Sequence, residues 1–196
     1  MRRRALLASV ASLSFASTAG CLTDARRTVS GHIYQDHGYA NLHAADEQYV
    51  CGSFPDDTDV RGWLFPDPPD DQRDVLTARA MEGEFSNDLL WAEGNSFVLL
   101  FEVRMPRDEA AFYNVGGPVR WTGWNTAEIS IRRSETHFSG DDDAQKLVCT
   151  AITKLDAENG GVPSEVTLAI RDQDTGESYG RYLLRGWTKQ CSAPSE

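Results

Sequence analysis

Residues 96–105 read SFVLLFEVRM and form the strongest strand pattern in this chain. β-Branched and aromatic residues favour strands, and Pro106 ends the run because proline cannot donate to a strand ladder. Apolar residues follow one another here without regular polar alternation, so we expect a central strand that is covered on both faces.

Other segments show weaker strand patterns on either side of this run. In residues 127–133 apolar Ile129 and Ile131 alternate with polar side chains, as in a half-buried strand. Residues 172–176, DQDTG, predict a hairpin turn between two strands. The expected strands are residues 29–34, 47–51, 96–105, 127–133, 146–154, 165–171 and 178–186, and residues 75–81 fit either a strand or a short helix.

The segment between residues 52 and 73 is rich in proline and aspartate. Such composition favours turns, so we expect an ordered surface loop held by Trp63, Leu64 and Phe65. No amphipathic helix pattern is evident. Together these patterns predict an all-β protein, an antiparallel β-sandwich of about eight strands, with residues 31–196 as a single domain.

The N-terminus has the pattern of an export signal. A positive cluster that includes Arg3 and Arg4 precedes an uncharged stretch, residues 5–16, which is too short to span a bilayer. Thr18, Ala19, Gly20 and Cys21 then resemble a lipobox, the site at which a cysteine is lipidated and the preceding residues are removed. Arg3 and Arg4 resemble a twin-arginine signal, although the Ser or Thr usual before the pair is missing, which leaves the general export route open.

This resemblance implies a defined organisation. Residues 1–20 would be a cleaved signal helix, Cys21 the lipidated first residue, and residues 21–30 a short tether. A diacyl lipid supplies two chains, which suffices for stable attachment. The expected location is the outer face of the cytoplasmic membrane, and the membrane is the expected partner through the lipid on Cys21.

The charge composition is strongly acidic. After residue 20 the chain keeps 16 of its 19 Lys and Arg residues and all 30 Asp and Glu residues, so the mature net charge is −14. Lysine is nearly absent. This composition resembles proteins of extreme halophiles, and with the signal the chain resembles an exported lipoprotein of a halophilic archaeon. It argues against nucleic acid as a partner, because phosphate binding requires clustered Lys and Arg.

Two motifs suggest catalysis or metal binding without the context that either needs. Residues 176–180, GESYG, match the G-x-S-x-G motif of serine hydrolases, but no His or Asp follows Ser178 and the setting is a hairpin. His32, His37 and His43 lie on an expected loop, with spacings that match no compact ligand pattern. We identify no catalytic residue and expect no cofactor.

Acidic loops offer the best candidates for calcium, which prefers several oxygen ligands from a turn-rich segment. Asp56, Asp57 and Asp59 are the first of these candidates. The halophilic composition accounts for the same residues without any bound ion, so we predict no specific metal site.

Aromatic residues near the middle of the chain are the candidates for ligand binding. Phe112, Tyr113, Trp121 and Trp124 lie on or near expected loops, where large rigid rings form platforms for sugars or partner surfaces. The alternative is that these rings fill the core, and core filling is the commoner use of such residues.

Three cysteines remain after Cys21. An exported protein can form disulfides, and Cys51 and Cys191 lie near strand ends, so we predict a Cys51–Cys191 disulfide. Cys149 lies within an apolar strand and is predicted to be a buried free thiol.

The sequence predicts the location of the protein more clearly than its biochemical function. The favoured hypothesis is a non-enzymatic, lipid-anchored surface module that binds a partner protein, a glycan or a small ligand, or that has a structural role in the envelope. The alternative is an extracytoplasmic enzyme, similar to a hydrolase, whose site is assembled from distant acidic residues. A cleft with close carboxylates of perturbed pKa would favour the enzyme.

Overall fold

A computed structural model describes residues 31–87, 90–91, 95–117, 119–140, 144–159 and 161–186. The expected signal and lipidation residues, among them Arg3, Arg4 and Cys21, lie outside these ranges, as does Cys191. The strands are β1 (Ile33–Ala44), β2 (Val60–Phe65), β3 (Ser96–Pro106), β4 (Ala111–Val115), β5 (Arg120–Trp121), β6 (Thr126–Glu135), β7 (Lys146–Ala157), β8 (Glu165–Asp172) and β9 (Ser178–Gly186). The helices are short: α2 (Ala78–Met81) and the 3-10 turns Gln72–Asp74, Glu84–Ser86 and Arg107–Glu109.

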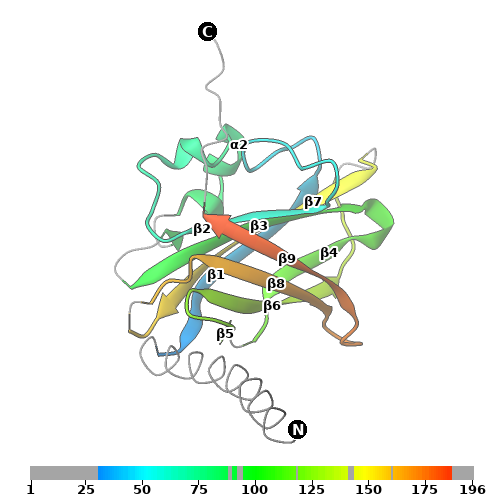
Figure 1. Cartoon of the computed structure of the whole chain (residues 1–196). Helices are drawn as coiled ribbons and strands as arrows, with labels where there is room; N and C mark the ends of the chain where they lie inside the picture. Colours follow the sequence, from blue (N-terminus) through cyan, green and yellow to red (C-terminus); the bar gives the residue numbers. More distant parts are fainter. Residues whose placement is uncertain are drawn as a thin grey trace, which may run out of the picture.

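The protein is mostly β, as the sequence predicts, but its strands form a single sheet (Figure 1). The strand order is β1-β7-β3-β2-β9-β8-β6-β4, and β5 pairs with β6. Two neighbouring pairs, β2 with β9 and β6 with β8, are parallel. The expected arrangement of two antiparallel sheets is therefore not what the described residues show. They form one mixed sheet instead.

The sheet curls so strongly that its two edge strands, β1 and β4, contact each other. Its inner face encloses the larger core, to which β1 contributes Leu42, β4 contributes Tyr113 and β6 contributes Ile129. Curling lets one sheet bury its own inner face, which a flat sheet would do only against a second layer. One curled sheet therefore encloses the inner core, whereas in a sandwich the core would lie between two sheets.

Strand β3 lies inside the sheet and is buried on both faces, which confirms the prediction from residues 96–105. Phe97, Leu99 and Phe101 join the inner core. Val98 and Leu100 point the other way, into a second core on the outer face of the sheet. Residues from the segment between β2 and β3 cover that second core; they include Val75, Leu76, Ala80, Phe85, Leu90 and Trp91.

Three expectations about the first part of the domain are wrong. Residues 47–51, expected as a strand, contain only an isolated bridge between Val50 and Leu76. Residues 60–65, expected within a surface loop, form β2, a strand with neighbours on both sides. The prolines and aspartates that suggested a loop flank this strand and do not interrupt it. The expected loop with three histidines is largely β1, which places His37 and His43 in a strand; most of its first half is exposed, so no apolar pattern marks it.

Other expectations from the sequence are confirmed. β6 alternates buried and partly exposed positions along most of its length. β8 and β9 form the expected antiparallel hairpin around residues 172–176. Within the described residues, no helix is long and apolar enough to span a membrane.

The outer face of the sheet divides into an apolar half and a polar half. Along β3, the outward-facing positions run from Val98 and Leu100 to Glu102 and Arg104. Glu102 is directly opposite Arg61 on β2 and Thr150 on β7. A row of polar residues thus crosses three neighbouring strands at the point where the apolar cover ends, and this row defines the candidate site.

Gly62 is a point of close contact between β2 and the neighbouring strand β3. A Cβ atom at this position would lie 2.7 Å from the Phe101 Cβ and 2.8 Å from the Leu100 carbonyl oxygen. We expect Gly62→Ala to lower the free energy of unfolding by about 1–3 kcal/mol, because neither of these atoms can move easily. Chemical denaturation measures the change. Gly186→Ala on β9 is the control, since its Cβ meets nothing within 4 Å; equal stability of the two variants would contradict this view of the core.

Candidate functional site

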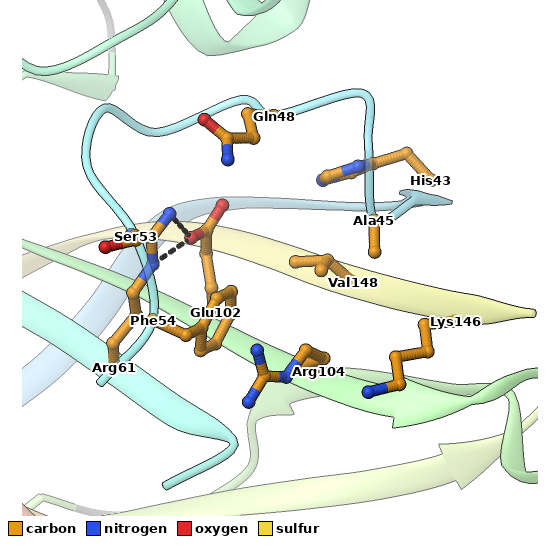
Figure 2. Close-up of a pocket in the computed structure, with 10 residues that line it drawn as sticks. All are labelled: His43, Ala45, Gln48, Ser53, Phe54, Arg61, Glu102, Arg104, Lys146 and Val148. Atoms are coloured by element: carbon orange, nitrogen blue, oxygen red, sulfur yellow. Dashed lines mark hydrogen bonds and ion pairs between the residues drawn. The ribbon is translucent and has the colours of Figure 1, made fainter. Parts of the chain in front are cut away.

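A pocket of about 230 Å³ opens beside the polar row on the outer face (Figure 2). Its floor comes from β2, β3 and β7, and the chain between β1 and β2 forms its opposite wall. The lining residues are His43, Ala45, Gln48, Ser53, Phe54, Arg61, Glu102, Arg104, Lys146 and Val148. A second hollow of about 530 Å³, lined by Arg107, Phe138 and their neighbours, is more open to solvent, and no charged residue that lines it is buried.

The Arg61–Glu102 ion pair lies at the base of the pocket. Both side chains are buried, with 6% and 1% exposure, and Arg61 Nε donates to Glu102 Oε2 at 2.5 Å. The second contact joins Arg61 Nη2 to the same oxygen, also at 2.5 Å. Burial raises the pKa of Glu102, while the charge of Arg61 and the hydroxyl of Thr150 oppose that rise. A buried pair of this kind is costly to desolvate and depends on complete hydrogen bonding.

Arg61 also holds the wall of the pocket in place. Its Nη1 donates to the Gly52 carbonyl oxygen at 2.8 Å and its Nη2 to the Val50 carbonyl oxygen at 3.1 Å. The guanidinium carbon lies 4.5 Å from the centre of the Phe54 ring, and that of Arg104 lies 4.8 Å from the same ring. Phe54 therefore contacts both arginines, and cation–π attraction adds to the hydrogen bonds that fix this segment.

Thr150 and His43 extend the buried polar row away from Arg61. Thr150 Oγ1 donates to Glu102 Oε1 at 2.8 Å and lies 2.9 Å from His43 Nε2. His43 Nδ1 lies 2.9 Å from the Ala44 carbonyl oxygen, and its ring stacks on Tyr49 with 4.1 Å between centres. Burial lowers the pKa of His43. The pocket is thus backed by a continuous chain of buried polar groups.

Two basic side chains lie nearer the surface. Arg104 donates from Nε to Asp59 Oδ1 at 2.7 Å, which leaves both terminal amino groups as donors. Lys146 is exposed, and among the described residues it has no ion-pair partner. Figure 2 shows both basic groups on the side of the pocket opposite Gln48. The pocket is therefore locally basic.

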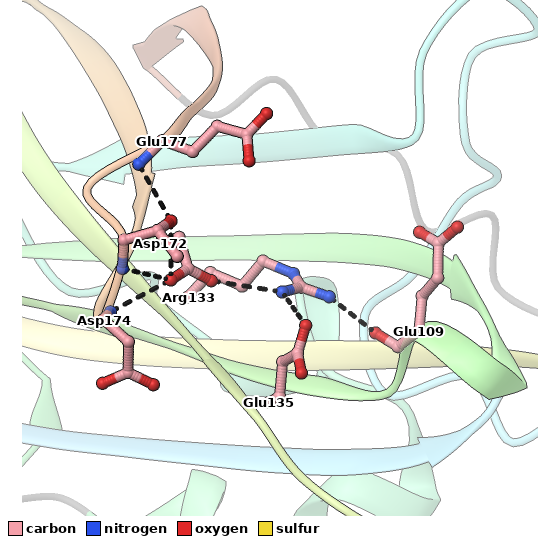
Figure 3. A network of polar contacts seen from close by, with 7 residues as sticks. Glu109, Arg133, Glu135, Asp172, Asp174 and Glu177 are labelled. Carbon is pink, nitrogen blue, oxygen red and sulfur yellow. Dashed lines mark hydrogen bonds and ion pairs between the residues drawn. The ribbon is translucent and has the colours of Figure 1, made fainter.

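A second buried arginine has a structural role (Figure 3). Arg133 on β6 is 4% exposed and donates to Glu135 at 2.9 Å, Asp172 at 3.4 Å and the Glu109 carbonyl oxygen at 3.3 Å. The Asp172 carboxylate in turn accepts from the main-chain N–H groups of Asp174 and Thr175. This network links the 3-10 turn before β4 to the β8–β9 turn, and the Arg133 guanidinium donates to groups of the protein itself.

The four predicted binding aromatics do not form one exposed surface. Tyr113 and Trp121 are buried, at 5% and 8% exposure, and belong to the inner core. Phe112 is half-buried and packs against that core. Trp124 alone of the four is exposed, at 49%. Phe112, Tyr113 and Trp121 thus match core filling, the alternative given above, whereas Trp124 does not.

The predicted calcium residues do not converge. Asp59 pairs with Arg104, while Asp56 and Asp57 are exposed. Within the part of the chain that the structure describes, no group of three or more His, Cys, Asp or Glu side chains is placed to hold a metal ion. His43 is one of the three histidines considered from the sequence, and its ring nitrogens contact Thr150 and Ala44.

Two cysteines of the domain have defined states. Cys149 is a free, buried thiol, and burial raises its pKa to about 12. Cys51 forms a disulfide. The Cys51–Cys191 pairing stays a prediction, because Cys191 lies outside the described residues.

Sequence reasoning missed the pocket, although one signal pointed to it. Glu102 is the only acidic residue in the apolar run of residues 96–105. A carboxylate in a strand covered on both faces requires a buried cation or a proton. The run itself therefore implied a polar partner, but Arg61 lies 41 positions away and no local pattern connects the two.

Comparison with models of known families, with characterised proteins and with solved structures gives no match for this chain.

The ion pair makes a strong prediction about stability. We expect Glu102→Ala to lower the free energy of unfolding by ~3–5 kcal/mol, because it leaves the Arg61 charge buried and unpaired. The double variant Arg61→Met/Glu102→Leu removes both charges and is expected to recover most of this loss. Denaturation of the three proteins measures both effects. A double variant as unstable as the single one would show that the loss does not come from the unpaired charge.

Proposed function

We propose that this chain is a lipid-anchored, extracytoplasmic binding module whose ligand site is the pocket beside the Arg61–Glu102 pair. The pocket combines apolar walls, from Phe54 and Val148, with a few fixed polar groups, the usual composition of a small-molecule site. Its volume of about 230 Å³ suits a small ligand or the end of a larger one, such as a peptide or a glycan.

The observation that carries this proposal is the charge of the pocket. The chain has a formal net charge of −11, yet three of the ten lining residues are basic and one is acidic. On such an acidic surface, basic groups gathered around a hollow are unexpected. The buried chain of Arg61, Glu102, Thr150 and His43 fixes the floor, so little ordering is needed when a ligand binds.

The anchor and the location rest on the N-terminal sequence. The lipobox-like residues before Cys21 support lipidation, and the acidic composition supports a halophilic source. The disulfide at Cys51 fits an exported protein, because disulfides persist in oxidising compartments.

An extracytoplasmic hydrolase has less support. Hydrolysis by a carboxylate pair needs two acidic side chains in one cleft. Glu102 is the one carboxylate among the lining residues, and Arg61 already engages it. We therefore favour binding over catalysis.

The anchor is tested by a single substitution. In the native host we expect the protein in the membrane fraction, with an intact mass equal to a chain that starts at Cys21 plus lipid. Cys21→Ser should be left unprocessed or released, since it lacks the sulfur that carries the lipid. Fractionation and intact mass measure both results. An uncleaved wild-type protein in the soluble fraction would contradict the anchor.

The pocket is tested by filling it. Ala45 lines the pocket, and Figure 2 shows its Cβ directed toward Val148. In a screen of small molecules by ligand-induced thermal shift in high salt, we expect ligands of the full-length protein to lose at least about tenfold in affinity in Ala45→Phe, which occupies their space. Ala78→Phe, on the exposed side of α2, is the control. Ligands that bind both variants equally would place the site elsewhere.

A further inference from the structure

Three short contacts join the buried polar groups behind the pocket. They link the Ala44 carbonyl oxygen to His43 Nδ1 at 2.9 Å, His43 Nε2 to Thr150 Oγ1 at 2.9 Å, and Thr150 Oγ1 to Glu102 Oε1 at 2.8 Å. His43 is 3% exposed, Thr150 0% and Glu102 1%. Water therefore has little access to these contacts.

Each of these contacts needs a proton between its two atoms. A neutral imidazole carries one ring proton, the Thr150 hydroxyl carries one, and an ionised Glu102 carries none. Two protons cannot serve three contacts. In these ionisation states one contact would bring two lone pairs together in a buried site, which costs as much as an unsatisfied buried group.

One additional proton supplies a hydrogen for each of the three contacts, in either of two arrangements. In the first, His43 is protonated on both nitrogens and donates from Nε2 to Thr150, which donates to an ionised Glu102. In the second, protonated Glu102 donates from Oε1 to Thr150, which donates to Nε2 of a neutral His43. The two arrangements have the same charge and differ by proton transfers along the two hydrogen bonds.

This proton is shared by His43, Thr150 and Glu102, so its titration is a property of the three groups together and not of one residue. Burial lowers the pKa of His43 and raises that of Glu102. Burial therefore brings the proton affinities of the two groups closer together, so that one proton can be shared between them. The hydrogen-bonded chain of His43, Thr150 and Glu102 gains one positive charge when it takes up this proton.

Arg104 and Lys146 indicate which class of ligand the pocket can bind. Both line the pocket, and Lys146 together with the terminal amino groups of Arg104 provides donors without a partner among the described residues. Charged donors at close range are the usual recognition elements for carboxylate, phosphate and sulfate groups.

We propose that the pocket binds an oxyanion and that the Glu102–Thr150–His43 chain takes up one proton as it does so. This inference rests on the proposed function, because it concerns the same pocket. A bound anion stabilises the added positive charge, and by reciprocal linkage the added charge strengthens the binding of the anion.

Other charges around the chain modify this coupling without replacing it. Glu47 and Arg79 act on His43 in opposite directions and pair with each other at 3.8 Å. Arg61 holds Glu102, and Asp59 holds Arg104. We therefore couple anion binding to the proton on the buried chain and not to these paired charges.

Calorimetry of sulfate binding to the full-length protein, in detergent and at constant high chloride, tests the proposal. Sulfate is a dianion in neutral and mildly acidic solution, so any proton taken up there comes to the protein. Titrations in buffers of different ionisation enthalpy measure this uptake. We expect uptake of up to one proton per sulfate, and an affinity that rises up to about tenfold per pH unit of acidification.

Variants of Thr150 and Lys146 test proton uptake and anion binding separately. Thr150→Val should abolish proton uptake, because it removes the hydroxyl that joins the two titrating groups, whereas Thr150→Ser should keep it. Lys146→Gln should weaken sulfate binding about tenfold at every pH. Lys154→Gln, at the other end of β7 where Lys154 pairs with Asp36, should leave sulfate binding unchanged.

The possible failures are distinguishable. Sulfate binding without proton uptake by the wild type would overturn the coupling but not the pocket. If sulfate does not bind while uncharged molecules bind and are lost in Ala45→Phe, the oxyanion class is wrong and the proposed function stands. If neither sulfate nor any screened molecule binds, both proposals fall. Equal sulfate binding by Lys146→Gln and the wild type would place the anion elsewhere.

Discussion

The ion pair between Arg61 and Glu102 connects the parts of the structure that matter most for the site. Glu102 lies on the most deeply buried strand, and its charge would be strongly unfavourable there without a cation and hydrogen bonds. Arg61 supplies both, and its remaining donors bind the carbonyl oxygens of Val50 and Gly52. One interaction thus joins β2, β3 and the chain segment that forms the wall of the pocket.

The two halves of the outer face show how this constraint shapes the protein. Over the apolar half, α2 and its neighbouring segments cover the sheet and exclude water. Over the polar half, the row formed by Arg61, Glu102 and Thr150 limits apolar packing, and the pocket lies there instead. The position of the pocket follows from the change in side-chain character along the outward-facing positions of β2, β3 and β7.

The buried ion pair and the exposed ion pairs differ in how strongly they depend on salt. Exposed ion pairs such as Arg79–Glu47 are strongly screened in concentrated salt, because the Debye length then shrinks to a few ångströms. The pair of Arg61 and Glu102 is shielded from ions by burial, so its strength depends little on salt. The chain therefore places its most sensitive electrostatic groups where the solvent affects them least.

The sequence is sufficient to place β3, β6, β7, β8 and β9, the burial of β3 on both faces and the hairpin of β8 and β9. These features follow from local apolar patterns and turn residues, which report directly on which side chains avoid water. It also determined the acidic surface. Predictions made from flanking composition were less successful, since prolines and aspartates around β2 concealed a strand with neighbours on both sides, and the polar outward positions of β1 concealed an edge strand.

Tertiary contacts alone establish the single curled sheet, the parallel pairs β2–β9 and β6–β8, and the pocket. Strand partners are chosen by contacts between distant segments, and the same apolar patterns fit a sandwich or a curled sheet equally well. The pocket brings together His43, Arg61, Glu102, Arg104 and Lys146, which come from four strands. These residues can act on one ligand because they are close together across the sheet. Such closeness between distant segments cannot be inferred from the order of residues along the chain.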